Sequence, residues 1–205
     1  MNMKSKNDEA EILDALRPDL EESEKIYRVV IRGRPPGILM NNIEGMMKQL
    51  GTRTRKINQK PTYEDEAEKA AYRDPETGGL YIPSKAIYGC IVNAGMGIKF
   101  GKFGAQRLLV TVRVFPERIP LGTKDYEIDV QSVVVNGSRV PRARPLLREW
   151  FVEFFIVFDT NFIVPGNLET VLKDAGKRVG ILDFRPQHRG QYGTFRLEKF
   201  EEVNL

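Results

Sequence analysis

The chain has 205 residues, of which 41% are hydrophobic and 29% charged, a composition sufficient for one globular domain with a sizeable core. Its apolar runs fall short of the roughly 20 residues of a membrane span, and its polar N-terminus is unlike a signal peptide. The single cysteine, Cys90, excludes an internal disulfide framework, and with one histidine in the chain a zinc site is not expected. These features predict a cytoplasmic protein without a metal or cofactor.

Charge is distributed unevenly along the chain. Residues 1–25 contain eight acids and four bases, a net charge of −4, so the remainder carries 28 bases and 20 acids, a net of +8. A basic body of this kind favours a polyanionic partner. We therefore divide the chain into an acidic N-terminal arm, residues 1–24, and one domain, residues 25–205. A short helix is expected at Asp8 to Leu16, where the arm would screen the basic surface or dock on a neighbouring copy.

The first half of the domain contains one strong strand pattern, at residues 25–33, where β propensity is high. The residues that follow, about 34–80, are predicted to form an insertion. It would hold a helix at Ile38 to Leu50, a basic segment at 51–62 with little to bury and therefore disordered, and a short acidic helix at Tyr63 to Tyr72.

The second half begins with a helix at Ser84 to Ala94, whose first turn is preset by Pro83. A second strand is predicted at Arg107 to Phe115, followed by a second insertion at about 116–148. Its Asn136-Gly137 pair is a strong hairpin signal. The remaining predicted elements are a very apolar strand at Trp150 to Phe158, a helix at Asn167 to Lys177 and a last strand at Thr194 to Val203.

Apart from the insertions, the elements occur in the order strand, helix, strand, strand, helix, strand. This βαββαβ order predicts an α+β protein of the ferredoxin-like, or RRM-like, class, with two helices on one face of an antiparallel sheet. The other face would be open to a ligand or covered by an insertion.

Three segments combine cationic side chains with glycine, proline or aromatic residues: 95–107, 138–148 and 176–196. Cations neutralise phosphates, aromatic faces stack on bases, and glycines let the backbone approach a ligand closely. The first and third segments are expected at the same end of the sheet, where they would form a groove. The predicted nucleic-acid-binding residues are Lys99, Lys102, Phe103, Arg107, Arg142, Arg144, Lys177, Arg178, Phe184, Arg185, His188, Arg189 and Tyr192. The alternatives are a solvated loop at 176–196 and a hairpin edge kept charged against aggregation.

The Leu80-Tyr-Ile-Pro-Ser84 entry to a helix and the basic, glycine-rich loop from Ala175 to Phe195 resemble the RAMP superfamily, over about half of the chain. Its members include the repeated backbone subunits of CRISPR effector complexes. The resemblance implies single-stranded RNA along the glycine-rich loop and head-to-tail assembly into a filament. The chain is also similar to uncharacterised phage-encoded proteins with a Gly-Ile-x-Asp-Phe-Arg-Pro run. The acidic arm and the Phe-Arg-Pro run depart from the superfamily, so RNA and DNA both remain open as ligands.

The sequence thus predicts a non-catalytic protein that binds single-stranded RNA or DNA, forms homo-oligomers along the strand and joins other subunits of a nucleoprotein complex, away from membranes. Its host would be a bacterial, archaeal or virus-infected cell. One alternative is a structural interaction subunit of a viral or effector assembly, whose basic loops meet an acidic neighbour. Another is a metal-independent endoribonuclease with His188 as general acid or base. A loop histidine beside Arg189 is, however, more typical of a phosphate contact.

Overall fold

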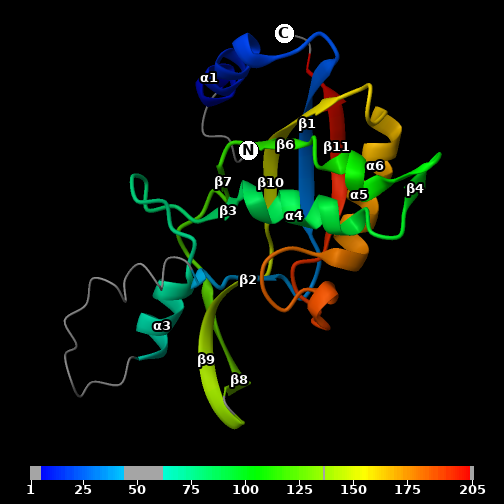
Figure 1. Cartoon of the computed structure of the whole chain (residues 1–205). Coiled ribbons are helices and arrows are strands. Elements are labelled where there is room, and N and C mark those ends of the chain that lie inside the picture. Colours follow the sequence, from blue (N-terminus) through cyan, green and yellow to red (C-terminus); the bar gives the residue numbers. More distant parts are fainter. Residues whose placement is uncertain (1–5, 44–61, 136, 204–205) are drawn as a thin grey trace.

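The computed structural model describes residues 6–43, 62–135 and 137–203, and its largest sheet has four strands (Figure 1). They are β1 (Glu24–Gly33), β6 (Arg113–Phe115), β10 (Phe151–Asp159) and β11 (Phe195–Glu202). They lie in the order β11-β1-β10-β6, and each neighbouring pair is antiparallel. The predicted α+β class, with antiparallel strands, is therefore confirmed.

The central strands β1 and β10 are apolar on both faces of this sheet. Successive side chains of a strand point to opposite faces. Val29 and Phe154 belong to the larger hydrophobic core on one face, whereas Ile26 and Phe155 belong to a smaller cluster on the other. Each of these four side chains is at most 2% exposed. Both faces of the sheet are therefore covered.

Helices α4 (Ser84–Ala94) and α6 (Pro165–Asp174) cover the face of the larger core (Figure 1). Ile87, Ile91, Leu168 and Leu172 pack there with almost no exposure. Helix α6 begins before the predicted Asn167, because Pro165 takes the first helical position after Val164. It continues into a single π turn, η2 (Ala175–Val179).

The N-terminal arm covers part of the opposite face. It consists of helix α1 (Lys6–Leu16) and the 3-10 turn η1 (Arg17–Asp19). Ile12, Leu13 and Leu16 pack against the cluster formed by Ile26, Phe155 and Val157. The arm, and not an insertion, thus covers this face. Docking of the arm on a neighbouring copy was one expectation, but the arm packs on its own domain.

The two predicted insertions meet and pair with each other. Strands β2 (Ile38–Leu39), β9 (Ser138–Leu147) and β8 (Glu127–Val135) form a second sheet in that order, and β3 (Tyr81–Pro83) pairs with β7 (Arg118–Pro120). Helix α3 (Tyr63–Ala70) lies beside β9 and starts with a capping box between Thr62 and Asp65. The β8–β9 hairpin projects away from the main sheet (Figure 1).

Two of the predicted elements are wrong. Ile38 and Leu39 form strand β2 and not the start of a helix, while residues 44–61, including most of the predicted helix and of the basic segment, lie outside the described residues. Residues 105–109 form helix α5 (Ala105–Leu109), so the strand predicted at 107–115 is reduced to β6. Both segments are short apolar runs, which suit a buried helix or a buried strand equally.

Three small elements complete the described structure. Strands β4 (Lys99–Phe100) and β5 (Phe103–Gly104) form a short hairpin in the first glycine-rich segment, and the 3-10 turn η3 (Pro186–His188) lies in the last one. Among the described helices, none combines the length and the apolar character that a bilayer span requires.

Candidate nucleic-acid interface

The segment between η2 and β11, residues 180–194, is a closed loop that hydrogen-bonds to itself and to the chain after β1. The Ile181 amide donates to the Gly193 carbonyl at 2.9 Å, and the Gly193 amide donates to Gly37 at 2.8 Å. Tyr192 donates through its amide to Phe184 at 3.0 Å. The loop is therefore an ordered platform and not a solvated connection.

The glycines of this loop serve its own packing. A Cβ on Gly190 would collide with the Phe184 carbonyl, and one on Gly193 would collide with the Ile181 carbonyl. Gly193 also has a φ of +70°, which L side chains rarely adopt. Close packing of the loop on itself therefore accounts for these glycines, whereas close approach to a ligand was the expectation. By contrast, Gly97 and Gly101 face open space.

Three non-glycine residues of the loop have left-handed backbone conformations: Leu182 at φ 58°, Phe184 at φ 47° and Arg189 at φ 63°. Such conformations are costly for bulky residues and persist where surrounding bonds enforce them. Here the Asp183 amide, between the first two, donates to the Leu39 carbonyl at 3.2 Å. Residues in such conformations cluster at functional sites, which makes this loop a candidate site on geometry alone.

Three of the predicted site residues fasten the β8–β9 hairpin to the loop. Arg144 pairs with Asp183 (Nε to Oδ2, 2.9 Å) and lies over the ring of Phe184 at 4.8 Å. Beside them, Gln131 donates to the Tyr192 hydroxyl at 3.1 Å. One face of Phe184 is thus already covered, and the Arg144 charge is already paired. Arg144 and Phe184 are not freely available to a phosphate or a base.

Three more predicted cations are engaged within the chain. Arg142 pairs with Glu66 of α3 at 2.8 Å. Arg178 pairs with Asp174 at 2.7 Å and donates to the Ala94 carbonyl at 2.8 Å. Arg185 donates to the Leu182 carbonyl at 2.7 Å and to Gln187 at 3.1 Å.

Other predicted cations remain exposed. Lys177, His188 and Arg189 are exposed near the loop, and Lys99, Lys102 and Arg107 lie in the first glycine-rich segment. Among the residues that the structure describes, none of these six makes an ion pair. The side chain of Phe103 lies outside the described part of the chain. The five lysines and arginines of this set are therefore free to meet phosphates, and His188 lies beside Arg189.

The two glycine-rich segments do not share one end of the sheet, contrary to the prediction. They start side by side, where Arg178 contacts Ala94, but the strands that they enter begin at opposite ends. The start of β6, Arg113, pairs with Val157, near one end of β10, whereas the start of β11, Phe195, pairs with Gly33 near the other. The reason is strand direction, because β6 is parallel to β1 and β11 is antiparallel to it.

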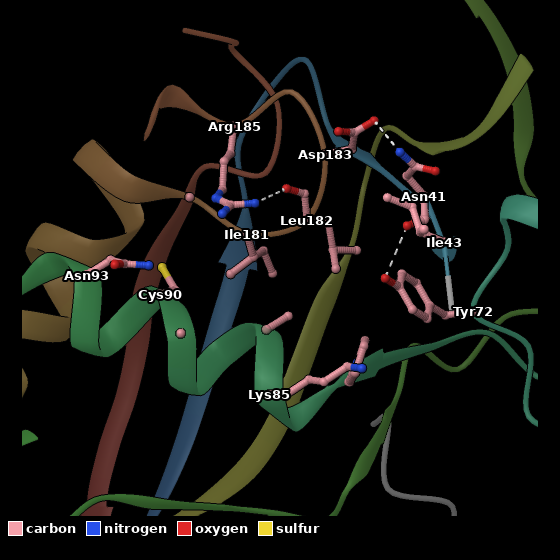
Figure 2. A pocket seen from close by; sticks show the side chains of 14 residues that line it. Asn41, Ile43, Tyr72, Lys85, Cys90, Asn93, Ile181, Leu182, Asp183 and Arg185 are labelled. Carbon is pink, nitrogen blue, oxygen red and sulfur yellow. Dashed lines mark hydrogen bonds between the residues drawn. The ribbon is translucent and has the colours of Figure 1, made fainter. Parts of the chain in front are cut away.

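A cavity of about 290 Å³ lies between the 180–185 part of the loop, one side of α4 and the chain after β2 (Figure 2). Lys85, in the first turn of α4, and Arg185, from the loop, bring positive charge to its walls. Amide groups come from Asn41 and Asn93, and Tyr72 donates its hydroxyl to the Asn41 carbonyl at 3.3 Å. The Asp183 carboxylate also lines the cavity, and its charge is paired with Arg144. The cations and amides of the remaining lining suit a phosphate and a polar ring.

Several of these cavity residues were not predicted from the sequence. Asn41, Tyr72, Lys85 and Asn93 all line it. Of these residues, only Lys85 could have been proposed from the sequence, because it falls in the first turn of a helix that was predicted correctly. Cys90 also lines the cavity, but burial raises the pKa of its thiol to about 12, so it is not poised as a nucleophile.

On the face of the main sheet that α1 covers, by contrast, positive charge is already neutralised by acids. Its arginines meet acids: Arg28 pairs with Glu9 of α1 and with Glu153, Arg32 with Glu198 at 2.6 Å, and Arg113 with Glu24 at 2.7 Å. Helix α1 also occupies the apolar part of this face. The cavity side of the molecule is therefore the better candidate for binding a polyanion.

Comparison with solved structures gives a result at the level of the fold. A chain of the solved structure described as "Cryo-EM structure of the Type III-B Cmr-beta bound to cognate target RNA" matches with a TM-score of 0.62 and 16% identity. The match covers 99% of this chain and 69% of that chain. No protein-family model and no curated protein matches the sequence. The chain thus shares its fold with a chain of that RNA-bound structure.

Proposed function

We propose that this protein is an RNA-binding subunit of a multisubunit nucleoprotein assembly. The observation that carries the proposal is the shared fold, since 99% of the chain matches a component of an RNA-bound effector complex. Lys177 and Arg189, which are exposed and make no ion pair among the described residues, are consistent with it, because phosphate neutralisation supplies most non-specific affinity for nucleic acids.

The core is proposed to be ferredoxin-like, with the N-terminal arm at 1–24 and insertions at about 34–80 and 116–148. The strand order β11-β1-β10-β6 supports this, because it places the last strand beside the first and the third beside the second. Helices α4 and α6 cover a single face, as in that arrangement.

The RNA would run past the loop at 180–194 as a single strand. Lys177 and Arg189 would meet phosphates, since both are exposed and without an ion pair in the described chain. The cavity beside Lys85 and Arg185 would hold one phosphate or base. Affinity would then come mainly from charge, with little base selectivity.

The same proposal includes a non-catalytic role, assembly of several copies along the strand together with other subunits, and a cytoplasmic location. His188 would contact phosphate and not transfer a proton, because it is exposed and makes no ion pair with a carboxylate among the described residues. Incubation of labelled RNA with wild type and His188→Gln tests this point. Cleavage by wild type that is lost in the variant would overturn the non-catalytic role.

Fluorescence anisotropy with labelled single-stranded RNA, single-stranded DNA and duplex, over a salt series, tests the proposal. We expect tight, salt-sensitive binding to single-stranded RNA. Weaker binding to DNA would identify the sugar as part of recognition. Absence of binding to RNA at low salt would overturn the proposed function.

A further inference from the structure

A second hollow, of about 820 Å³, lies between the β4–β5 hairpin, α5 and the connection from β10 to α6 (Figure 1). That connection follows Asp159, which is opposite Glu24 at the start of β1. The loop at 180–194 leads into Phe195, which is opposite Gly33 at the end of β1. The hollow is therefore at the other end of the main sheet, and it has no lining residue in common with the cavity described above.

The apolar part of this hollow comes from two segments, each held by the core. Phe162 and Val164 are 52% and 53% exposed, whereas Ile163 between them is 2% exposed. The buried side chain fixes the turn, so its two neighbours line the hollow. On the other side, Phe100 and Leu108 pack partly against the larger core. A group of accessible apolar side chains of this kind marks a binding surface.

Positive charge and amide groups border the same hollow. Lys99 and Arg107 line it, and neither makes an ion pair within the described chain. Asn161 and Asn167 also line it, together with the hydroxyl-bearing Thr160. No acid is among the described residues of its lining.

Acids close to these residues in the sequence or in the sheet are already engaged. The Asp159 carboxylate accepts the amide two residues further on at 2.8 Å. Glu169 pairs with Lys173 at 2.7 Å, and Glu24 pairs with Arg113 at 2.7 Å. The two cations of the hollow are therefore free to meet an anionic ligand.

The combination of these groups matches the parts of a nucleotide. Cations neutralise a phosphate, and an accessible aromatic ring stacks on a base. Asparagine amides both donate and accept, as the edge of a base requires. An acidic peptide would use the cations and the apolar side chains, but it would have less use for two amides beside them. The volume is within the roughly 300–1,000 Å³ of small-ligand sites.

We propose that this hollow binds one nucleotide, with the base against Phe162 and the phosphate at Lys99 and Arg107. The nucleotide is a free mononucleotide or one unit of an RNA strand, since both present the same phosphate and base. The site goes beyond the proposed function, because its residues lie outside the loop at 180–194 and the cavity.

Calorimetric titration of the full chain with adenosine 5′-monophosphate tests the site. Asn167→Asp adds an acid to the lining without changing its shape and should weaken binding roughly fivefold. The variant should fold, because an acid is favourable in the first turn of a helix such as α6. Phe162→Ala removes the stacking face and should weaken binding roughly fivefold or more. Gln106→Glu is the control, because it adds the same charge on an exposed side chain outside the lining.

Anisotropy with labelled single-stranded RNA distinguishes the two sources of the nucleotide. Weaker RNA binding by Asn167→Asp than by Gln106→Glu would identify a unit of the strand. Unchanged RNA affinity, with loss of the mononucleotide only, would identify a free nucleotide.

Three results would overturn the site. One is mononucleotide binding that is equal in wild type, Asn167→Asp and Phe162→Ala, and another is equal weakening by Gln106→Glu. The third is absence of mononucleotide binding together with unchanged RNA affinity in Asn167→Asp. In that case, binding of a hexaglutamate peptide that Asn167→Asp weakens would identify an acidic protein as the partner instead. Salt-sensitive RNA binding by wild type would leave the proposed function standing after any of these failures.

Discussion

The guanidinium of Arg144 lies over the ring of Phe184, with Cζ 4.8 Å from the ring centroid. The same group is 2.9 Å from the Asp183 carboxylate, and the Arg144 side chain is only 13% exposed. One side chain from the hairpin therefore makes both a charge contact and a cation–π contact with two consecutive loop residues. Since Phe184 has a left-handed backbone, this contact also holds a strained residue in place.

Arg144→Ala should lower the free energy of unfolding by about 2 kcal/mol. Removing one member of a buried pair costs about 3–5 kcal/mol, and the partial exposure of Asp183, at 27%, reduces that figure. Urea denaturation measures the change. Arg148→Ala is the matched control, because Arg148 and Glu127 form a pair that is 61% and 59% exposed and should contribute less than about 1 kcal/mol. Equal losses in the two variants would contradict the assignment of Arg144 as the fastening residue.

The same chemical change at two glycines should have opposite effects on stability. Gly190→Ala forces a Cβ against the Phe184 carbonyl and should cost about 1–3 kcal/mol, as other overpacked sites do. Gly89→Ala, inside α4, meets nothing within 4 Å and should stabilise the protein by about 0.5–1 kcal/mol. Thermal unfolding of both variants checks this. A neutral Gly190→Ala would show that the loop can relax around the new methyl group.

Local sequence patterns predicted the elements that are long and regular. Helix α4 has the expected bounds, and the expected hairpin is present as β8 and β9. The helical period and the Asn-Gly pair that predicted them are local signals. Residues 107–109 were mistaken for part of a strand because Leu108 and Leu109 belong to an apolar run without a clear period. Only tertiary packing decides the structure of such a run.

The candidate site was predicted only in part, because a sequence shows charges but not their partners. Arg142 and Arg144 were expected to be free, and they pair with Glu66 and Asp183 from distant segments. The sequence located the loop at 180–194 but did not show what its glycines do. A glycine that lets the loop pack on its own backbone has the same sequence signal as one that lets a ligand approach. The prediction that segment 95–107 lies at the same end of the sheet as this loop was wrong, because the directions of the strands that follow the two segments were not considered.

Lys177 and Arg189 should contribute additively to RNA affinity if both neutralise phosphates. Each change to alanine should weaken binding to every single-stranded RNA similarly and reduce the slope of log K against log salt by about 0.7. Arg196→Ala is the control, since Arg196 already pairs with Glu198 at 3.3 Å. Anisotropy titrations over a salt series give the slopes. Slopes equal to that of wild type would remove both cations from the interface.

A hydrogen-bond network around the Glu68 carboxylate, which joins the two insertions, predicts a pH-dependent contribution to stability. Glu68 accepts two bonds from Arg73, at 2.5 and 2.8 Å, and one from the Tyr126 hydroxyl at 2.8 Å. The bond with Arg73, followed by that with Tyr126, holds the pKa of Glu68 below its ordinary value of 4.5 although partial burial opposes this. A carboxyl whose pKa is lower in the folded state stabilises the protein above its unfolded pKa, and this contribution disappears as the pH falls through the folded pKa.

The stability difference between wild type and Glu68→Gln should therefore be constant at neutral pH and shrink once the pH falls below 4.5, the ordinary value for this carboxyl. Urea denaturation at a series of pH values measures it. Tyr126→Phe, which removes one of the three bonds to the carboxylate, should start from a smaller difference than Glu68→Gln. A difference for Glu68→Gln that stays constant down to acid unfolding would show that the Arg73 contact does not favour the ionised carboxylate.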